Sequence, residues 1–225
     1  MPDRGLLEAG QVDDVAFGAP SGLTIANACW LQITFEVEKQ AALESMPGDV
    51  GRPIPPYGRL LIAQSTHLSL AVLSVGGRYK MMPRNIVVAT VVEGADGAGL
   101  FGQGTAHGRV ALERDGQDVT ATLSGPEGPL ARAALPSIYA IEPSMLRWDA
   151  FVALARADGE AVVAEITPAH TLETAFLSKG AALEVDPGLP RTHPWRRLRS
   201  LGIISACYAE GSLSFSEPVV QQTLG

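Results

Sequence analysis

The sequence predicts a mainly β fold, a single-domain antiparallel closed barrel or double sheet with few short helices. Short apolar or alternating segments recur along the chain, separated by turns that contain glycine and proline. No period of 20 to 50 residues repeats, so the pattern is not that of a solenoid or a propeller. A barrel closed by many strands can enclose an internal ligand cavity in place of a solid core, and we expect such a cavity here. We expect residues 1–20 to form an N-terminal arm and residues 21–225 to form the β domain.

The first elements follow from hydrophobic periodicity. Alternation of apolar and polar residues over 31–37 predicts a half-buried strand. Good helix formers over 38–46 predict a short helix that ends at Pro47-Gly48. A proline-rich link over 51–58 then leads into two apolar runs, 59–65 and 68–75, which are typical of strands buried on both faces.

The β pattern continues to the end of the chain. It runs over 76–92, where Pro83 indicates an edge or a bulge. The glycine-rich residues 93–108 are expected to be mostly turn, and Asp115-Gly116 predicts a hairpin. Residues 146–168 are ambiguous: a helix over 145–155 is one interpretation, but Asp158-Gly159 before a β-branched run favours strand, turn and strand. The chain closes with two strands around a turn at Glu210-Gly211.

Charge and composition exclude several classes of protein. The formal net charge is −7, and the one dense basic run, Arg196 to Arg199, is better explained as a solvated approach to a strand than as a nucleic-acid patch. No apolar run is long enough to span a membrane, and the first twenty residues do not resemble a secretory signal. Cys29 and Cys207 lie in apolar segments, as expected of buried thiols in a reducing cytoplasm. We expect no metal, since the four histidines have no ligand spacing, and no cofactor.

Four segments together resemble the acetoacetate decarboxylase superfamily over residues 25–219. They are, in order, "ITFEVEKQAALESMP", "LAVLSVGGRYKMMPRNIVV", "GLFGQGTAHGRVAL" and "HPWRRLRSLGIISACYAEGSLSF". None of these motifs is specific alone, and the resemblance rests on their order and spacing. It implies the barrel with its cavity and a tendency to form homo-oligomers.

The same resemblance implies a chemistry that this chain lacks. In the family a lysine attacks the carbonyl of a β-keto acid, and a neighbouring lysine and an apolar pocket keep that amine neutral. The motif places Thr105 and Ala106 at the two lysines, and Gln64, His67 and Ala28 near the family's glutamates and arginine. A threonine hydroxyl cannot form an imine. Of the three lysines in the chain, only Lys80, between two core strands, is a candidate for a relocated nucleophile.

The remaining polar residues near the implied cavity suggest acid–base chemistry. His67, Arg84 and His107 are the candidate catalytic residues, because a histidine can transfer protons near neutral pH and an arginine can stabilise an enolate. Structural roles are also open: His107 can satisfy a backbone carbonyl, and Arg84 can pair with Glu93 or Glu36. The candidate substrate-binding residues are Gln64, Thr105, Trp30, Met82 and Tyr208.

The sequence leaves three functions open. The first is a cytoplasmic small-molecule enzyme that works without an imine, a cyclase, lyase or isomerase acting on a keto-bearing, polyketide-like substrate. A composition rich in Ala, Gly, Pro and Arg with few lysines suggests a GC-rich genome and bacterial specialised metabolism, such as antibiotic biosynthesis. The second is a ligand-binding relative without catalysis, and the third is a decarboxylase that uses Lys80. A small molecule is the expected partner in each, with neither nucleic acid nor membrane.

Overall fold

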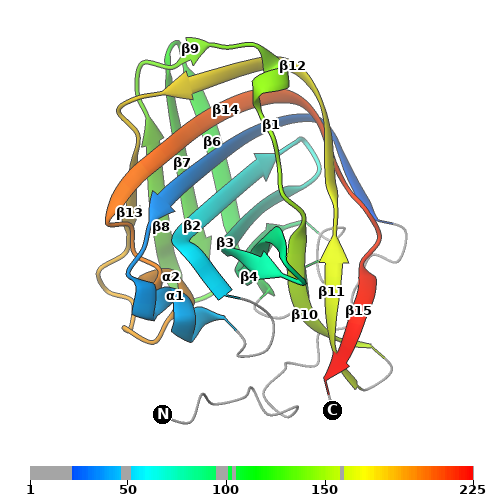
Figure 1. The fold of residues 1–225 in the computed structure, drawn as a ribbon. Helices are drawn as coiled ribbons and strands as arrows, with labels where there is room; N and C mark the ends of the chain where they lie inside the picture. The colour runs from blue at the N-terminus through cyan, green and yellow to red at the C-terminus, as the bar shows by residue number, and fades with distance from the viewer. Residues whose placement is uncertain (1–21, 47–51, 95–100, 103–104, 158–159, 225) are drawn as a thin grey trace.

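Two β-sheets make up the fold of the computed structural model, which describes residues 22–46, 52–94, 101–102, 105–157 and 160–224 (Figure 1). The large sheet has the strand order β15-β11-β10-β4-β3-β2-β1-β14-β12-β9, and β5 also pairs with β4. The small sheet has the order β13-β8-β7-β6. Pairing is antiparallel except where β4 meets β10 and β5. The predicted arm, residues 1–20, lies outside the described residues.

The strands and helices have the following bounds. The large sheet contains β1 (Leu23–Glu36), β2 (Arg52–Gln64), β3 (Ser69–Tyr79), β4 (Met82–Glu93), β5 (Thr105–His107), β9 (Tyr139–Ala140), β10 (Phe151–Ala157), β11 (Glu160–Ile166), β12 (Pro168–Ser178), β14 (Gly202–Phe215) and β15 (Val219–Leu224). The small sheet contains β6 (Arg109–Asp115), β7 (Asp118–Gly125), β8 (Gly128–Leu135) and β13 (Ala182–Val185). The helices are α1 (Lys39–Ser45), α2 (Pro194–Arg197) and the 3-10 turn η2 (Pro143–Met145).

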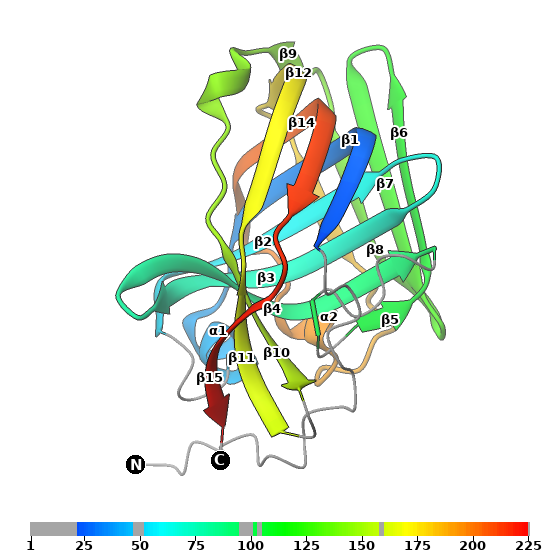
Figure 2. The same ribbon diagram turned by 90° about the vertical axis from the view of Figure 1, so that its right-hand side faces the viewer.

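The predicted closed barrel is wrong, whereas the double-sheet alternative is confirmed. Within the described residues neither sheet closes on itself, since β15 and β9 end the large sheet and β13 and β6 end the small one. The strands of the small sheet cross behind β14, β1 and β2 of the large sheet, as in orthogonal sheet packing (Figures 1 and 2). Because the strands of the two sheets cross, backbone hydrogen bonds do not join the sheets into one closed barrel. An internal ligand cavity remains a prediction.

Apolar side chains cover both faces of the large sheet. On one face, Leu31, Leu60 and Leu73 pack with residues of the small sheet such as Val119 and Leu135. On the other face, a second core includes Trp30, Leu61 and Val72 together with Phe151 of β10. Strands β2 and β3 are therefore buried on both sides, as their continuous apolar runs predicted.

Several predicted elements are confirmed. The short helix appears as α1, and the Asp115-Gly116 hairpin joins β6 to β7. In the ambiguous stretch the strand interpretation is correct, because β10 pairs with β11 and helical structure is limited to η2. No helix of the described chain has the length and apolar character that crossing a bilayer requires.

Two predicted connections are strands instead. The proline-rich link belongs to β2, whose pairing with β3 jumps from Arg52 to Tyr57, so its prolines fall where the ladder is irregular and no N–H is needed. The turn predicted at Glu210-Gly211 is a bulged region inside β14. Gly211 has φ +150° and lies where the registers with β1 and β12 both shift. Gly211 therefore accommodates a bulge, and the strand continues beyond it.

Candidate functional site

Six polar side chains form one row across the large sheet where it faces the small sheet. Each pair of neighbours is directly opposite in the strand register, and opposite residues share a face of the sheet. The row, which we call the polar row, consists of Glu93 (β4), Ser69 (β3), Gln64 (β2), Cys29 (β1), Glu210 (β14) and Thr174 (β12). It lies where β2 and β4 end and β3 begins. The next row in the direction of the core is apolar or aromatic, including Leu31 and Tyr208.

Strand β6 binds to this row through every second residue. Its backbone N–H groups at Val110 and Leu112 donate to Glu93 Oε2 at 2.9 Å and to Gln64 Oε1 at 2.7 Å. Two residues further along, the Arg114 side chain donates to Glu210 Oε1 at 2.9 Å. Because β6 is a terminal strand of its sheet, these N–H groups have no neighbouring strand. Side chains of the polar row therefore accept hydrogen bonds from β6 N–H groups that have no partner strand, and these bonds join the two sheets.

Glu210 is the most heavily bonded residue of the row. Tyr208 Oη and Arg114 Nη1 both donate to its Oε1, and Thr174 Oγ1 donates to its Oε2 at 3.0 Å. Burial pushes the pKa of Glu210 upward, but the three donors outweigh it and hold the pKa below its ordinary value. The carboxylate is therefore ionised at neutral pH and is better suited to orient its neighbours than to accept a proton.

Tyr208 is held as a neutral hydrogen-bond donor. Burial, hydrogen bonding with the Cys29 thiol and the Glu210 carboxylate all raise the pKa of its phenol. Tyr208 is 2% exposed, so ionisation of its phenol would place a second, poorly solvated negative charge beside Glu210. The phenol can donate a proton or a hydrogen bond but cannot act as a resting phenolate.

Arg114 is the cation of the site. Its guanidinium lies 4.4 Å from the ring centroid of Phe176 and 5.5 Å from that of Tyr208, and its side chain is about one-third exposed. Nε donates to the Gly116 carbonyl and Nη1 to Glu210, so Nη2 has no hydrogen-bond partner among the described residues. A fixed guanidinium with a free N–H can hold a carboxylate or polarise a carbonyl.

Five of the sequence-predicted residues lie at this end of the sheet. Gln64 is part of the polar row. His67 is exposed in the turn between β2 and β3, and His107 is exposed on β5, opposite Val92. Thr105 is partly buried on the same strand, with its hydroxyl donating to the Gly102 carbonyl at 2.8 Å. Tyr208 contacts the row through Glu210.

The other three predicted residues lie elsewhere. Arg84 is nine residues from Glu93 along β4, about 30 Å at the usual rise per residue. Its partner is neither of the two predicted carboxylates but Glu165, with Nε at 3.1 Å and Nη2 at 3.0 Å. Met82 is 54% exposed near the tip of the same hairpin. Trp30 belongs to the core on the opposite face, stacked on Trp148 at 4.4 Å.

All three lysines are exposed. Lys39 lies on α1 and Lys179 follows β12. Lys80 occupies the β3–β4 turn with φ +47°, and its Nζ donates to the side chain and the backbone carbonyl of Gln221 on β15. None of these amines is enclosed in the apolar pocket in which an imine-forming lysine is held.

Sequence reasoning missed Arg114, Glu210, Cys29 and Thr174. A signal was present for Arg114, because it shares its strand parity with Val110 and Leu112 and so falls on the buried face of β6. The signal for Glu210 was a carboxylate within an otherwise apolar segment. The turn predicted at Glu210-Gly211 implied that this carboxylate is solvated. Among the described residues, no group of three His, Cys, Asp or Glu side chains could hold a metal ion.

No protein-family profile matches the sequence, and no curated protein matches it. Solved structures do. An acetoacetate decarboxylase from Legionella pneumophila superposes with a TM-score of 0.76 at 13% identity, covering 91% of this chain and 89% of its own. An acetoacetate decarboxylase-like enzyme from Sphingomonas wittichii RW1 gives 0.70 at 11% identity, covering 91% and 94%.

A third similar structure is MppR, an enduracididine biosynthesis enzyme, in complex with the condensation product of pyruvate and imidazole 4-carboxaldehyde. It superposes with a TM-score of 0.71 at 10% identity, covering 89% of each chain. These likenesses show that the chain has the acetoacetate decarboxylase-like fold, as the resemblance of its sequence predicted.

Proposed function

We propose that the chain is a small-molecule enzyme that acts on a carbonyl compound at the polar row without forming an imine. The observation that carries this proposal is that every lysine is exposed, whereas the polar row offers the Cys29 thiol and holds the Arg114 guanidinium and the neutral Tyr208 phenol through Glu210. Solved structures of this fold include MppR in complex with pyruvate and with a condensation product of pyruvate, which supports a carbonyl substrate. The finer proposal is a cyclase, lyase or isomerase for a keto-bearing, polyketide-like substrate of bacterial specialised metabolism.

The roles follow from the geometry. Arg114 Nη2 holds the carbonyl or the enolate oxygen, since developing negative charge next to a fixed guanidinium needs no reorganisation. Tyr208 donates its one hydroxyl proton to Glu210 and so helps to hold that carboxylate in place beside Arg114. Glu210 positions both groups, and the exposed histidines at the same end, His67 and His107, are proposed to move protons. Arg84 is not part of this site.

The decarboxylase alternative is less well supported. Lys80 already donates to Gln221 on β15 and lies beyond Arg84 on the hairpin, at the far end of β4 from the polar row. A covalent route from there would need the hairpin to rearrange. The ligand-binding alternative differs from the proposal only in turnover, so experiment has to separate them.

The test uses borohydride and mass spectrometry together. The purified protein is incubated with acetoacetate or a short poly-β-keto thioester, treated with sodium borohydride and analysed for lysine adducts, while product formation is followed by liquid chromatography. We expect turnover of the thioester and no adduct, with turnover lost in Arg114→Gln and kept in Arg78→Gln, a matched exposed arginine on β3. An adduct at Lys80 would favour the decarboxylase. Saturable binding without turnover would favour the binding protein.

A further inference from the structure

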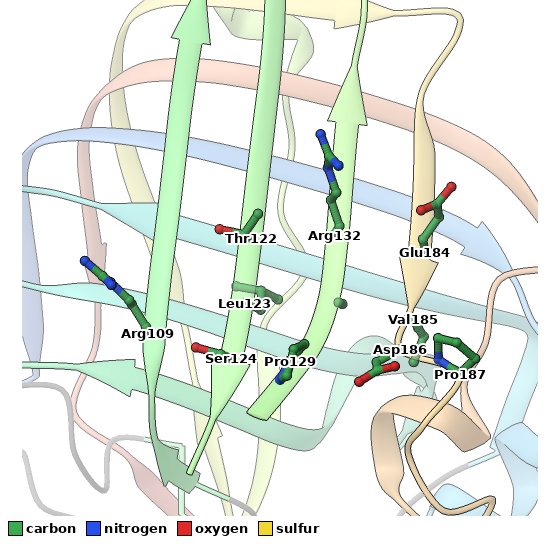
Figure 3. A pocket seen from close by; sticks show the side chains of 11 residues that line it. Arg109, Thr122, Leu123, Ser124, Pro129, Arg132, Glu184, Val185, Asp186 and Pro187 are labelled. Carbon is green, nitrogen blue, oxygen red and sulfur yellow. The ribbon is translucent and has the colours of Figure 1, made fainter. Parts of the chain in front are cut away.

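A hollow of about 450 Å³ lies on the outer face of the small sheet, on the side that faces away from the polar row (Figure 3). Alternation along the strands separates the two faces: Leu123 and Ala131 point to the core, whereas Thr122 and Arg132 point away from it. No strand or helix of the described chain covers this face. Its volume falls in the range of small-molecule sites, which run from about 300 to 1,000 Å³.

A bulge builds the hollow. The register between β7 and β8 moves from Leu123–Ala131 to Ser124–Pro129, so Leu130 is an extra residue in β8. The Leu130 carbonyl accepts the N–H of Asp186 at 2.9 Å, which fixes the segment after β13 as a wall. The Asp186 carboxylate then accepts the N–H of Gly188 at 2.9 Å and closes a turn there. The bulge in β8 thus forms the floor of the hollow, and the turn after β13 forms its wall.

Two arginines and two carboxylates line the hollow. Arg109 of β6 and Arg132 of β8 line it, and within the described chain neither guanidinium has a carboxylate within 4 Å, although Glu184 lies directly opposite Arg132. The hydroxyls of Thr122 and Ser124 lie between the two arginines in the register. The two carboxylates of the lining are Glu184 and Asp186, and Asp186 Oδ1 accepts the Gly188 N–H within its own turn.

We infer that this hollow binds a small organic carboxylate with an apolar body. A carboxylate accepts two parallel hydrogen bonds from the Arg132 guanidinium and a further one from the Thr122 hydroxyl, while Pro129 and Pro187 give the apolar body a surface. Arg109, on the far side of β7, attracts the same charge. The inference is independent of the proposed function, because the two sites lie on opposite faces of the small sheet.

The test is a titration followed by nuclear magnetic resonance with benzoate and with benzamide, its neutral isostere. We expect benzoate to give saturable shifts of the Thr122 and Ser124 amides and benzamide to bind at least about tenfold more weakly, since only the carboxylate makes charge-assisted hydrogen bonds. Arg132→Gln should weaken benzoate binding by a similar factor. Arg78→Gln, a change in an exposed arginine of β3, should not.

Three results would overturn the inference: no saturable shift up to about 10 mM benzoate, ten times a millimolar Kd; equal affinity for benzamide; or unchanged affinity in Arg132→Gln. Arg109→Gln provides a second variant, with a smaller loss expected. Thermal unfolding of each variant verifies that it is folded.

Discussion

Arg114 and Glu210 are 96 positions apart in the sequence, and their side chains meet at 2.9 Å where β6 crosses the large sheet. The guanidinium lies over the Phe176 ring, and the carboxylate also accepts Tyr208 and Thr174. One ion pair therefore joins the two sheets and sets the orientation of the donors in the proposed site. An exposed pair of this kind contributes little to stability by itself, so its geometry matters more for orientation.

The first prediction concerns stability against pH. Glu210 has a lowered pKa in the folded chain, so its contribution is fully present above the unfolded value of about 4.3 and is lost as the pH falls through the folded pKa. The difference in free energy of unfolding between the natural chain and Glu210→Gln should be largest near pH 7 and should shrink below about pH 4. Urea titrations at several pH values measure it. A difference that stays constant with pH would contradict the assignment.

The second prediction concerns the junction between the sheets. Gln64→Leu removes the acceptor of the Leu112 N–H and leaves that partly buried donor unpaired, which should cost about 1–3 kcal/mol of unfolding free energy. Gln40→Leu is the matched control, because Gln40 bonds Glu44 on the exposed surface of α1. Urea unfolding compares the two. Equal losses would mean that the bond to Leu112 does not hold β6 in place.

The third prediction separates the roles of the phenol and the carboxylate. Since the pKa of Tyr208 is raised and its one proton is donated to Glu210, the phenol acts as a neutral positioning group. Tyr208→Phe removes that hydrogen bond and should lower turnover of the thioester about tenfold or more while leaving the fold intact. The rate should show no alkaline decline from Tyr208 below pH 10, since the phenol keeps its proton there. Turnover against pH in the natural chain and the variant measures this. A descending limb that disappears in Tyr208→Phe would show that the phenol titrates and contradict the assignment.

The β class, most strands and the hairpin at Asp115-Gly116 were predictable because local periodicity and turn chemistry specify them. The crossing of β6 over the large sheet was not, since it depends on side chains from β4, β2 and β14 that are distant in sequence. Gln64 and Tyr208 were identified as binding candidates, but the groups that connect them, Arg114 and Glu210, were not. Glycine at 211 suggested a turn, and only the register of both neighbouring strands distinguishes a turn from a bulge.

The last prediction tests that bulge. A Cβ at position 211 would lie 2.2 Å from the Thr171 carbonyl oxygen, and φ +150° is unfavourable for any residue with a side chain. Gly128 has a comparable φ of +133° but open space where its Cβ would be, so Gly128→Ala isolates the backbone strain, about 1–3 kcal/mol. Gly211→Ala should lose clearly more than Gly128→Ala in urea unfolding, because β12 must also move away. That movement would shift Thr174, which pairs with Glu210, so the same variant should also lose turnover. Equal destabilisation by the two substitutions, or full turnover in Gly211→Ala, would show that the close approach at the bulge is not needed to hold the polar row.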